Sequence, residues 1–111
     1  MTEEIKKMSK QLGQLSKEVP SVMNYFTKLD QECVKDGVLS RKIKELMALA
    51  IGVAIRCKPC IQFHTAEAVK AGANREEILE AASVSVFMGG GPSVAYIATE
   101  LLPVLDELKV K

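Results

Sequence analysis

The sequence predicts an all-α fold of about six helices. Aromatic residues make up only 5% of the 111 residues and tryptophan is absent, so the side chains that favour strands are scarce. Seven glycines and four prolines are too few for the many tight turns of a sheet-rich protein. Apolar residues recur instead at helical spacing between recognisable helix starts and ends. The length suits a single domain, residues 1–111.

The first two helices are predicted over residues 3–17 and 21–35. The dipeptide Val19-Pro20 separates them, because the residue before a proline disfavours the helical conformation. The apolar face of the first helix is formed by Ile5, Met8, Leu12 and Leu15. The apolar face of the second helix is formed by Val22, Phe26, Leu29 and Cys33. We therefore expect Cys33 to pack in the core.

The third helix is predicted to begin after Ser40, whose side chain suits the N-cap position. Residues 46–55 within it carry no charge, and apolar side chains cover every face. A helix that is apolar all round must be surrounded by protein, and a six-helix domain of this size has little room to enclose one. This segment therefore predicts a subunit interface.

The fourth and fifth helices have clear local start signals. Pro59 suits the first turn of the fourth helix, which runs to about Ala71. Asn74 followed by Glu77 matches an N-cap with an acidic residue at the third helical position. The fifth helix is therefore predicted to begin after Asn74 and to extend through Met88.

The last helix is predicted to begin near Pro92, after the triple glycine 89–91, and to reach about Leu108. Pro103 lies inside it, and a proline in a helix interior removes a hydrogen bond and clashes with the preceding turn. We expect Pro103 to bend or break this helix into the pieces 93–102 and 104–108.

The charge pattern excludes several classes of partner. Fifteen basic and fourteen acidic residues give a net charge of +1 without a block of like charge, so we expect no nucleic-acid partner. The charge-free segments 46–55 and 81–99 indicate buried interior, because the first is too short to cross a bilayer and glycines interrupt the second. The N-terminus lacks the apolar core of a secretory signal. We expect a cytoplasmic protein without a membrane partner.

Reactive residues gather in the segment Cys57-Lys58-Pro59-Cys60, followed by His64, the only histidine. Residues four apart share one face of a helix, so the His64 imidazole can reach the Cys60 sulfur. Two cysteines three apart at a helix start have Cα atoms about 5 Å apart, within the range that a disulfide requires. Unpaired N–H groups and the helix dipole, with Lys58 or protonated His64 nearby, favour a thiolate. Such a thiolate can attack a peroxide or a disulfide, and the second thiol then closes an internal disulfide.

From about Leu39 to Leu102, the sequence resembles the carboxymuconolactone decarboxylase family, in its alkylhydroperoxidase D (AhpD-like) branch. The family signature is a glutamate followed by Cys-x-x-Cys-x-x-x-His. The residues that match this signature in type and spacing are Glu45, Cys57, Cys60 and His64. Residues 71–78 are similar to the family's usual continuation. The thioredoxin fold, which also uses a Cys-x-Pro-Cys segment, does not fit because no strand precedes Cys57.

The resemblance implies an all-α, AhpD-like bundle that forms homo-oligomers, commonly trimers or hexamers. It implies a peroxidase of the peroxiredoxin type or a disulfide reductase, with a peroxide or disulfide as substrate and a dithiol reductant or carrier protein as partner. Cys57 and Cys60 are then the redox pair, and Glu45 and His64 form a proton relay, with no cofactor and no metal. We take Cys60 as the thiolate that His64 activates, and the reverse order of the cysteines stays open.

Spacing alone does not bring Glu45 to the thiols. Glu45 lies twelve residues before Cys57, about 18 Å along a straight helix. In a simple antiparallel hairpin it lies opposite residues near Lys70, so its contact with His64 rests on the resemblance.

Three other readings stay open. Members with hydroperoxidase character often carry a histidine immediately before the second cysteine, where this chain has Pro59, and this favours a general disulfide reductase or a redox sensor. A carboxymuconolactone decarboxylase-like enzyme acting on a small carboxylate or lactone is the second, although such members generally lack the cysteine pair. A zinc-binding structural or interaction protein is the third, because two thiolates and an imidazole are zinc ligands and Cys33 is a candidate fourth.

Overall fold

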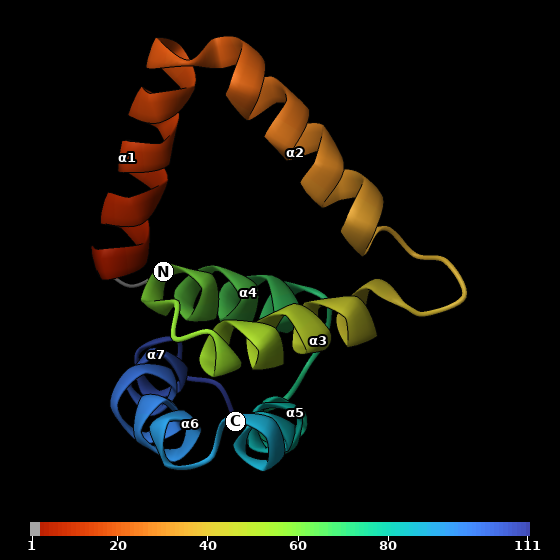
Figure 1. Ribbon diagram of the computed structural model, residues 1–111, viewed down its shortest axis with the longest axis vertical. Coiled ribbons are helices and arrows are strands. Elements are labelled where there is room, and N and C mark those ends of the chain that lie inside the picture. The colour runs from red at the N-terminus through yellow and green to blue at the C-terminus, as the bar shows by residue number, and fades with distance from the viewer. Residues whose placement is uncertain (1–2) are drawn as a thin grey trace.

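The computed structural model describes residues 3–111, and every regular element in that range is helical (Figure 1). The elements are α1 (Glu3–Glu18), α2 (Pro20–Val34), α3 (Arg41–Ala54), α4 (Lys58–Lys70), α5 (Arg75–Gly89), α6 (Gly91–Tyr96), the π-helical segment η1 (Ile97–Leu101) and α7 (Leu102–Glu107). Since α6, η1 and α7 follow one another without a loop, the described chain forms six helical rods, and the all-α prediction is confirmed. Residues 1–2, part of the N-terminus read above for a secretory signal, lie outside the described residues.

Local capping decides where two of the helices begin. The Ser40 hydroxyl accepts a hydrogen bond from the Ile43 N–H at 3.2 Å, at the start of α3. The Asn74 side chain accepts from the Glu77 N–H at 2.9 Å, while the Glu77 carboxylate accepts from the Asn74 N–H at 3.0 Å. This reciprocal pair is a capping box, which satisfies two backbone donors that the first turn leaves unpaired. Both predicted helix starts are confirmed.

Pro103 does not interrupt the last rod with a loop. It lies in the first turn of α7, directly after η1, where the Leu102 N–H bonds to the Ile97 carbonyl five residues earlier. A wider π turn before the proline, followed by a new first turn in which its missing N–H is not needed, keeps the rod continuous. The chain therefore does not break here as expected. The hydrogen-bond pattern of the rod changes instead at residues 97–102.

The core lies where α3, α4, α5 and the final rod meet. Fully buried apolar side chains from all four come together there, and they include Leu49, Ile61, Ile78, Leu101 and Leu105. Figure 1 shows α3 and α4 side by side across the middle of the molecule, with α5, α6 and α7 on one side of them. Packing in this core holds the start of α4, where both cysteines lie, against the end of α3.

The helices α1 and α2 form an arch on the other side of α3 and α4 (Figure 1). The foot of α1 is held by Ile5, which is buried together with Ala66 and Val104. Much of α2 has no cover in the single chain, so Phe26, Leu29 and Cys33 are exposed. The prediction that Cys33 packs in the core is therefore wrong for this chain, because its helix stands away from the bundle.

The charge-free segments are only partly buried. In α3, Leu49 and Val53 are fully buried, but Ile51 is 57% exposed. In α5, Phe87 and Met88 are 87% and 78% exposed. The expectation that both segments lie in the interior is thus wrong for part of each, because the bundle covers only one side of these helices. Among residues 3–111, no helix is long and apolar enough to cross a membrane.

Candidate redox site

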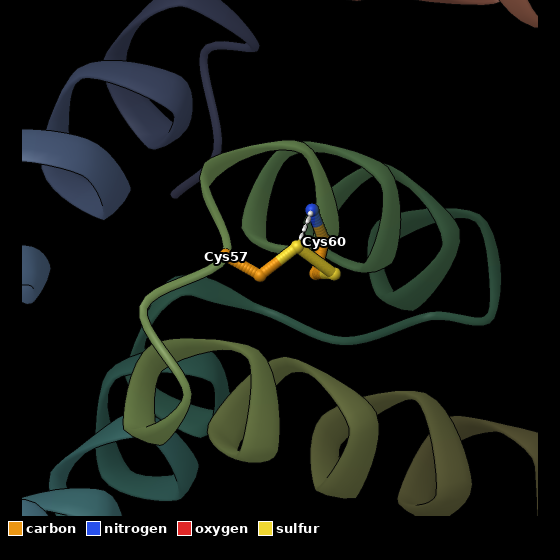
Figure 2. Close-up of a disulfide and its surroundings, with 2 residues drawn as sticks. All are labelled: Cys57 and Cys60. Atoms are coloured by element: carbon orange, nitrogen blue, oxygen red, sulfur yellow. Dashed lines mark hydrogen bonds between the residues drawn. A yellow bond between two sulfur atoms is a disulfide. The ribbon is translucent and has the colours of Figure 1, made fainter.

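Cys57 and Cys60 form a disulfide at the start of α4 (Figure 2). Cys57 is the N-cap residue of the helix, and Cys60 lies in its first turn. Their Cα atoms are 5.2 Å apart, close to the separation predicted from helix spacing. The disulfide therefore forms without any departure from ordinary helix geometry.

The end of α3 fixes the position of Cys57. The Cys57 N–H donates to the Gly52 carbonyl at 2.9 Å, and the Arg56 N–H donates to the Val53 carbonyl at 3.1 Å. This pair of bonds is the Schellman pattern, which requires a left-handed residue that is usually glycine. Arg56 fills that place with a φ of 59°. Arg56, directly before the first cysteine, thus has a strained backbone, which costs about 1 kcal/mol.

The Cys57 sulfur accepts a hydrogen bond from the Cys60 N–H at 3.2 Å (Figure 2). The helix N-terminus therefore acts on Cys57 rather than on Cys60. Once the disulfide is reduced, the same N–H can stabilise negative charge on the Cys57 sulfur. The stabilisation of a thiolate that we expected from the helix start therefore applies to Cys57, which we assigned as the partner thiol.

Glu45 and His64 are in direct contact. The His64 Nδ1 and the Glu45 Oε1 lie 2.8 Å apart, and Glu45 is only 1% exposed. A simple antiparallel hairpin was expected to place Glu45 opposite residues near Lys70, and this expectation is wrong. Glu45 faces His64 instead, which lies closer to the connection between α3 and α4. Arg41 bonds to Glu67 at 3.0 Å, one turn further along both helices, which shows the same register.

Cys60 and His64 both open onto a cavity of about 600 Å³ between α1, α2 and α4. Most of its wall is apolar, and the large apolar side chains there include Met8, Leu12, Leu15, Met23, Phe26 and Phe63. Cys57 does not line this cavity. A molecule held there meets Cys60 and the imidazole together, and apolar groups on it are removed from water.

Lys58, the residue after Cys57, pairs with carboxylates rather than with the sulfurs. Its Nζ lies 3.5 Å from Glu4 and 3.7 Å from Glu100, while the Gln62 amide donates to Glu4 at 2.6 Å. These contacts join the foot of α1 to the first turns of α4. Two carboxylates therefore offset the positive charge of Lys58, which we expected to act on the thiols.

Two residues that hold the elements around the site together were not identified from the sequence. Gln62 was overlooked because nothing in its local pattern shows that Glu4, 58 residues away, is its partner. Gly52 had a visible signal, since a glycine in a helix interior costs about 1 kcal/mol relative to alanine and calls for a packing reason. Its backbone lies against Cys60.

Within residues 3–111, no three His, Cys, Asp or Glu side chains are arranged to hold a metal ion. Cys33, the candidate fourth zinc ligand, is exposed on α2. The described residues therefore assemble a disulfide beside an imidazole–carboxylate pair and offer no closed zinc site.

Comparison with known proteins supports a family assignment. A model described as the carboxymuconolactone decarboxylase family matches residues 20–101. An uncharacterized protein of Cupriavidus necator is 35% identical over 101 residues, which are 91% of this chain and 88% of the relative. Among solved structures, a carboxymuconolactone decarboxylase family protein from Legionella pneumophila is 46% identical, with a TM-score of 0.86 over 92% of this chain and 90% of the other. A family protein from Thermotoga maritima, linked to antioxidative response, is 34% identical, with a TM-score of 0.72 over 78% of this chain and 88% of the other.

Proposed function

The chain belongs to the carboxymuconolactone decarboxylase family, and we propose that it is a thiol-dependent oxidoreductase that cycles Cys57 and Cys60 between dithiol and disulfide. One observation carries this proposal. Cys60, one half of the disulfide, lies with His64 on the wall of one apolar cavity, and His64 is bonded to the buried Glu45. A reactive sulfur, a proton carrier and a substrate-sized space therefore occur together.

With a hydroperoxide, the reduced Cys60 thiolate attacks the terminal oxygen. The S–O bond forms as the O–O bond breaks, and the leaving alkoxide takes a proton from His64, which yields an alcohol and a sulfenic acid. The Cys57 thiol then attacks the Cys60 sulfur, the disulfide forms and water leaves. The substrate has gained the two electrons that the thiols have lost. Glu45, which contacts Nδ1 at 2.8 Å, holds the imidazole in place between these steps.

With a disulfide substrate, the same groups carry out exchange. Cys60 attacks one sulfur, the other leaves as a thiolate that takes the His64 proton, and Cys57 resolves the mixed disulfide. In either case a dithiol reductant or carrier protein supplies two electrons and two protons to restore the pair. The apolar wall of the cavity favours substrates that carry an apolar group over hydrogen peroxide.

We also propose that the chain acts as a homo-oligomer, a trimer or a hexamer. Exposed apolar residues on α3 and α5, such as Ile51, Phe87 and Met88, support this proposal. Monomeric proteins rarely expose large contiguous apolar patches, and a second copy is the simplest cover for them.

Cysteine variants test the redox cycle. We expect the reduced wild type to lose about 2 Da, two hydrogens, when treated with cumene hydroperoxide, and to turn over with dithiothreitol. Cys60→Ser should lower the turnover rate roughly a hundredfold or more, since it removes the nucleophile. Cys57→Ser should stop after a single sulfenic acid forms, because nothing resolves it.

Cys33→Ser is the matched control, since Cys33 is exposed and outside the cavity. It should form the internal disulfide and turn over like the wild type. Full turnover in Cys60→Ser, or a wild type that never forms the internal disulfide, contradicts the redox proposal. Activity on a lactone that survives both cysteine substitutions would favour the decarboxylase-like alternative instead.

A further inference from the structure

Gly52 is a buried glycine in the interior of α3, where an alanine is intrinsically the better helix former. Two of its atoms face the redox motif. Its carbonyl accepts the Cys57 N–H at 2.9 Å, and its Cα lies against Cys60. Both cysteines are thus placed by one residue that lies outside the Cys-x-x-Cys segment.

The absence of a side chain at Gly52 permits this close approach. A Cβ built there would lie 3.1 Å from the Cys60 Cβ, and 3.6 Å from the Cys60 carbonyl carbon and the Ile61 nitrogen. A separation of 3.1 Å is tighter than ordinary van der Waals contact, so a methyl group would push the start of α4 outward by a few tenths of an ångström. By contrast, a Cβ on Gly13, in the interior of α1, meets nothing within 4 Å.

The same approach controls the contact between Glu45 and His64. Glu45 and Gly52 are seven residues apart, so they lie on one face of α3, and both are buried. They contact α4 at His64 and at Cys60, which are four residues apart on α4. A wider gap between the helices at Gly52 therefore also lengthens the 2.8 Å contact between the imidazole and the carboxylate.

We propose that Gly52 is a positioning residue that holds α3 and α4 close enough for Cys60, His64 and Glu45 to act together. This inference rests on the proposed redox function, because its effect on rate has meaning only if Cys60 reacts. Its effect on geometry stands apart from turnover. The two can therefore be measured separately.

Gly52→Ala is the test variant, and Gly13→Ala, the same change in open space, is the matched control. For Gly52→Ala we expect the rate constant with cumene hydroperoxide to fall about tenfold, since small displacements of reacting groups have effects of this size. The pH midpoint of thiol reactivity should rise, because a weaker contact with Glu45 leaves the imidazole beside Cys60 less able to stabilise the thiolate. The imidazole NMR signals, which are assigned at once because His64 is the only histidine, should shift in the oxidised protein. Gly13→Ala should match the wild type in all three.

A second variant, Glu45→Asp, shortens the carboxylate by one methylene and leaves Gly52 intact. We expect it to shift the imidazole signals as Gly52→Ala does, so the requirement for close approach is tested even if Gly52→Ala folds poorly. Unchanged imidazole signals in both variants overturn the inference. A Gly52→Ala protein that only unfolds more easily, with its pH midpoint and imidazole signals unmoved, overturns it as well, because Gly52 then has a merely structural role. A wild type that never turns over, with imidazole signals that do respond to Gly52→Ala, counts against the redox function and leaves the positioning role standing.

Discussion

Glu45 is a carboxylate in the protein interior, and its stability there depends on a polar partner. Removing an ionised group from water costs several kcal/mol unless hydrogen bonds and opposite charge compensate. The His64 ring nitrogen at 2.8 Å provides this partner, and the imidazole is itself mostly covered. A buried carboxylate–imidazole pair beside a disulfide supports the proposal that this is a functional site rather than a solvated surface.

Glu77 is one residue through which the fold should respond to acid. The Lys42 ammonium and the Asn74 N–H both donate to its carboxylate, and they hold its pKa below the ordinary value of 4.5. A carboxyl whose pKa is lower in the folded state stabilises the fold at neutral pH, and this contribution is lost as the pH falls through the folded-state pKa. The contribution should therefore be complete above about pH 4.5 and should be lost progressively at lower pH.

Glu77→Gln should weaken this acid response. We expect the free energy of unfolding by urea to fall less steeply between about pH 5 and about pH 3 in the variant than in the wild type. Glu76→Gln removes the same charge from the neighbouring exposed position and serves as the control. An acid response in Glu77→Gln as steep as that of the wild type contradicts the assignment.

At the scale of elements, the turn from α5 to α6 depends on two adjacent glycines. Gly90 has a φ of 66° and a ψ of −144°, a region that residues with a Cβ rarely occupy. Gly89 lies against the buried Ser93, whose hydroxyl would clash with any Cβ at position 89. Gly90 therefore permits the sharp reversal, and Gly89 permits the close contact between the two helices.

A double-mutant cycle tests the contact between Gly89 and Ser93. Gly89→Ala should lower the free energy of unfolding by about 1–3 kcal/mol, because the new methyl group overlaps the Ser93 hydroxyl. In a Ser93→Ala background the overlapping oxygen is gone, so the same change should cost much less. Urea unfolding of the four proteins measures the difference. Equal costs in both backgrounds mean that strain at the turn, and not this contact, restricts position 89.

At the scale of the whole molecule, the single chain leaves apolar surface uncovered in two places. One is the cavity under the arch of α1 and α2, and the other is the set of exposed apolar residues on α3 and α5. The radius of gyration of the chain is 14.0 Å, above the roughly 13 Å expected for a compact domain of this length. The arch accounts for the excess, because it encloses the apolar cavity instead of packing fully on the bundle. The apolar surface left outside is the physical basis for expecting subunit association.

Phe87→Glu tests that expectation. Phe87 is 87% exposed in the single chain, so a charge there should leave the isolated fold intact. If another copy covers it, the charge should disrupt the oligomer, and sedimentation velocity should show a shift toward monomer. Gln14→Glu adds the same charge to the exposed side of α1 and is the control. A wild type that sediments as a monomer at all concentrations contradicts the oligomer proposal.

Local sequence determined the features of this protein that depend on neighbours along the chain. The starts of α3 and α5 were predictable because Ser40 and Asn74 cap turns within three residues of themselves. The spacing of Cys57 and Cys60 was predictable for the same reason, since helix geometry alone places their Cα atoms in disulfide range.

Tertiary structure decided what depends on how helices meet. The contact of Glu45 with His64 and that of Gly52 with Cys60 follow from the register of α3 against α4, which no local pattern encodes. The exposure of Cys33 follows from the position of α2 in the arch, since an apolar stripe shows which face seeks cover and not what covers it. Periodicity is a property of one helix, whereas register and burial are properties of pairs, and the site is built from pairs.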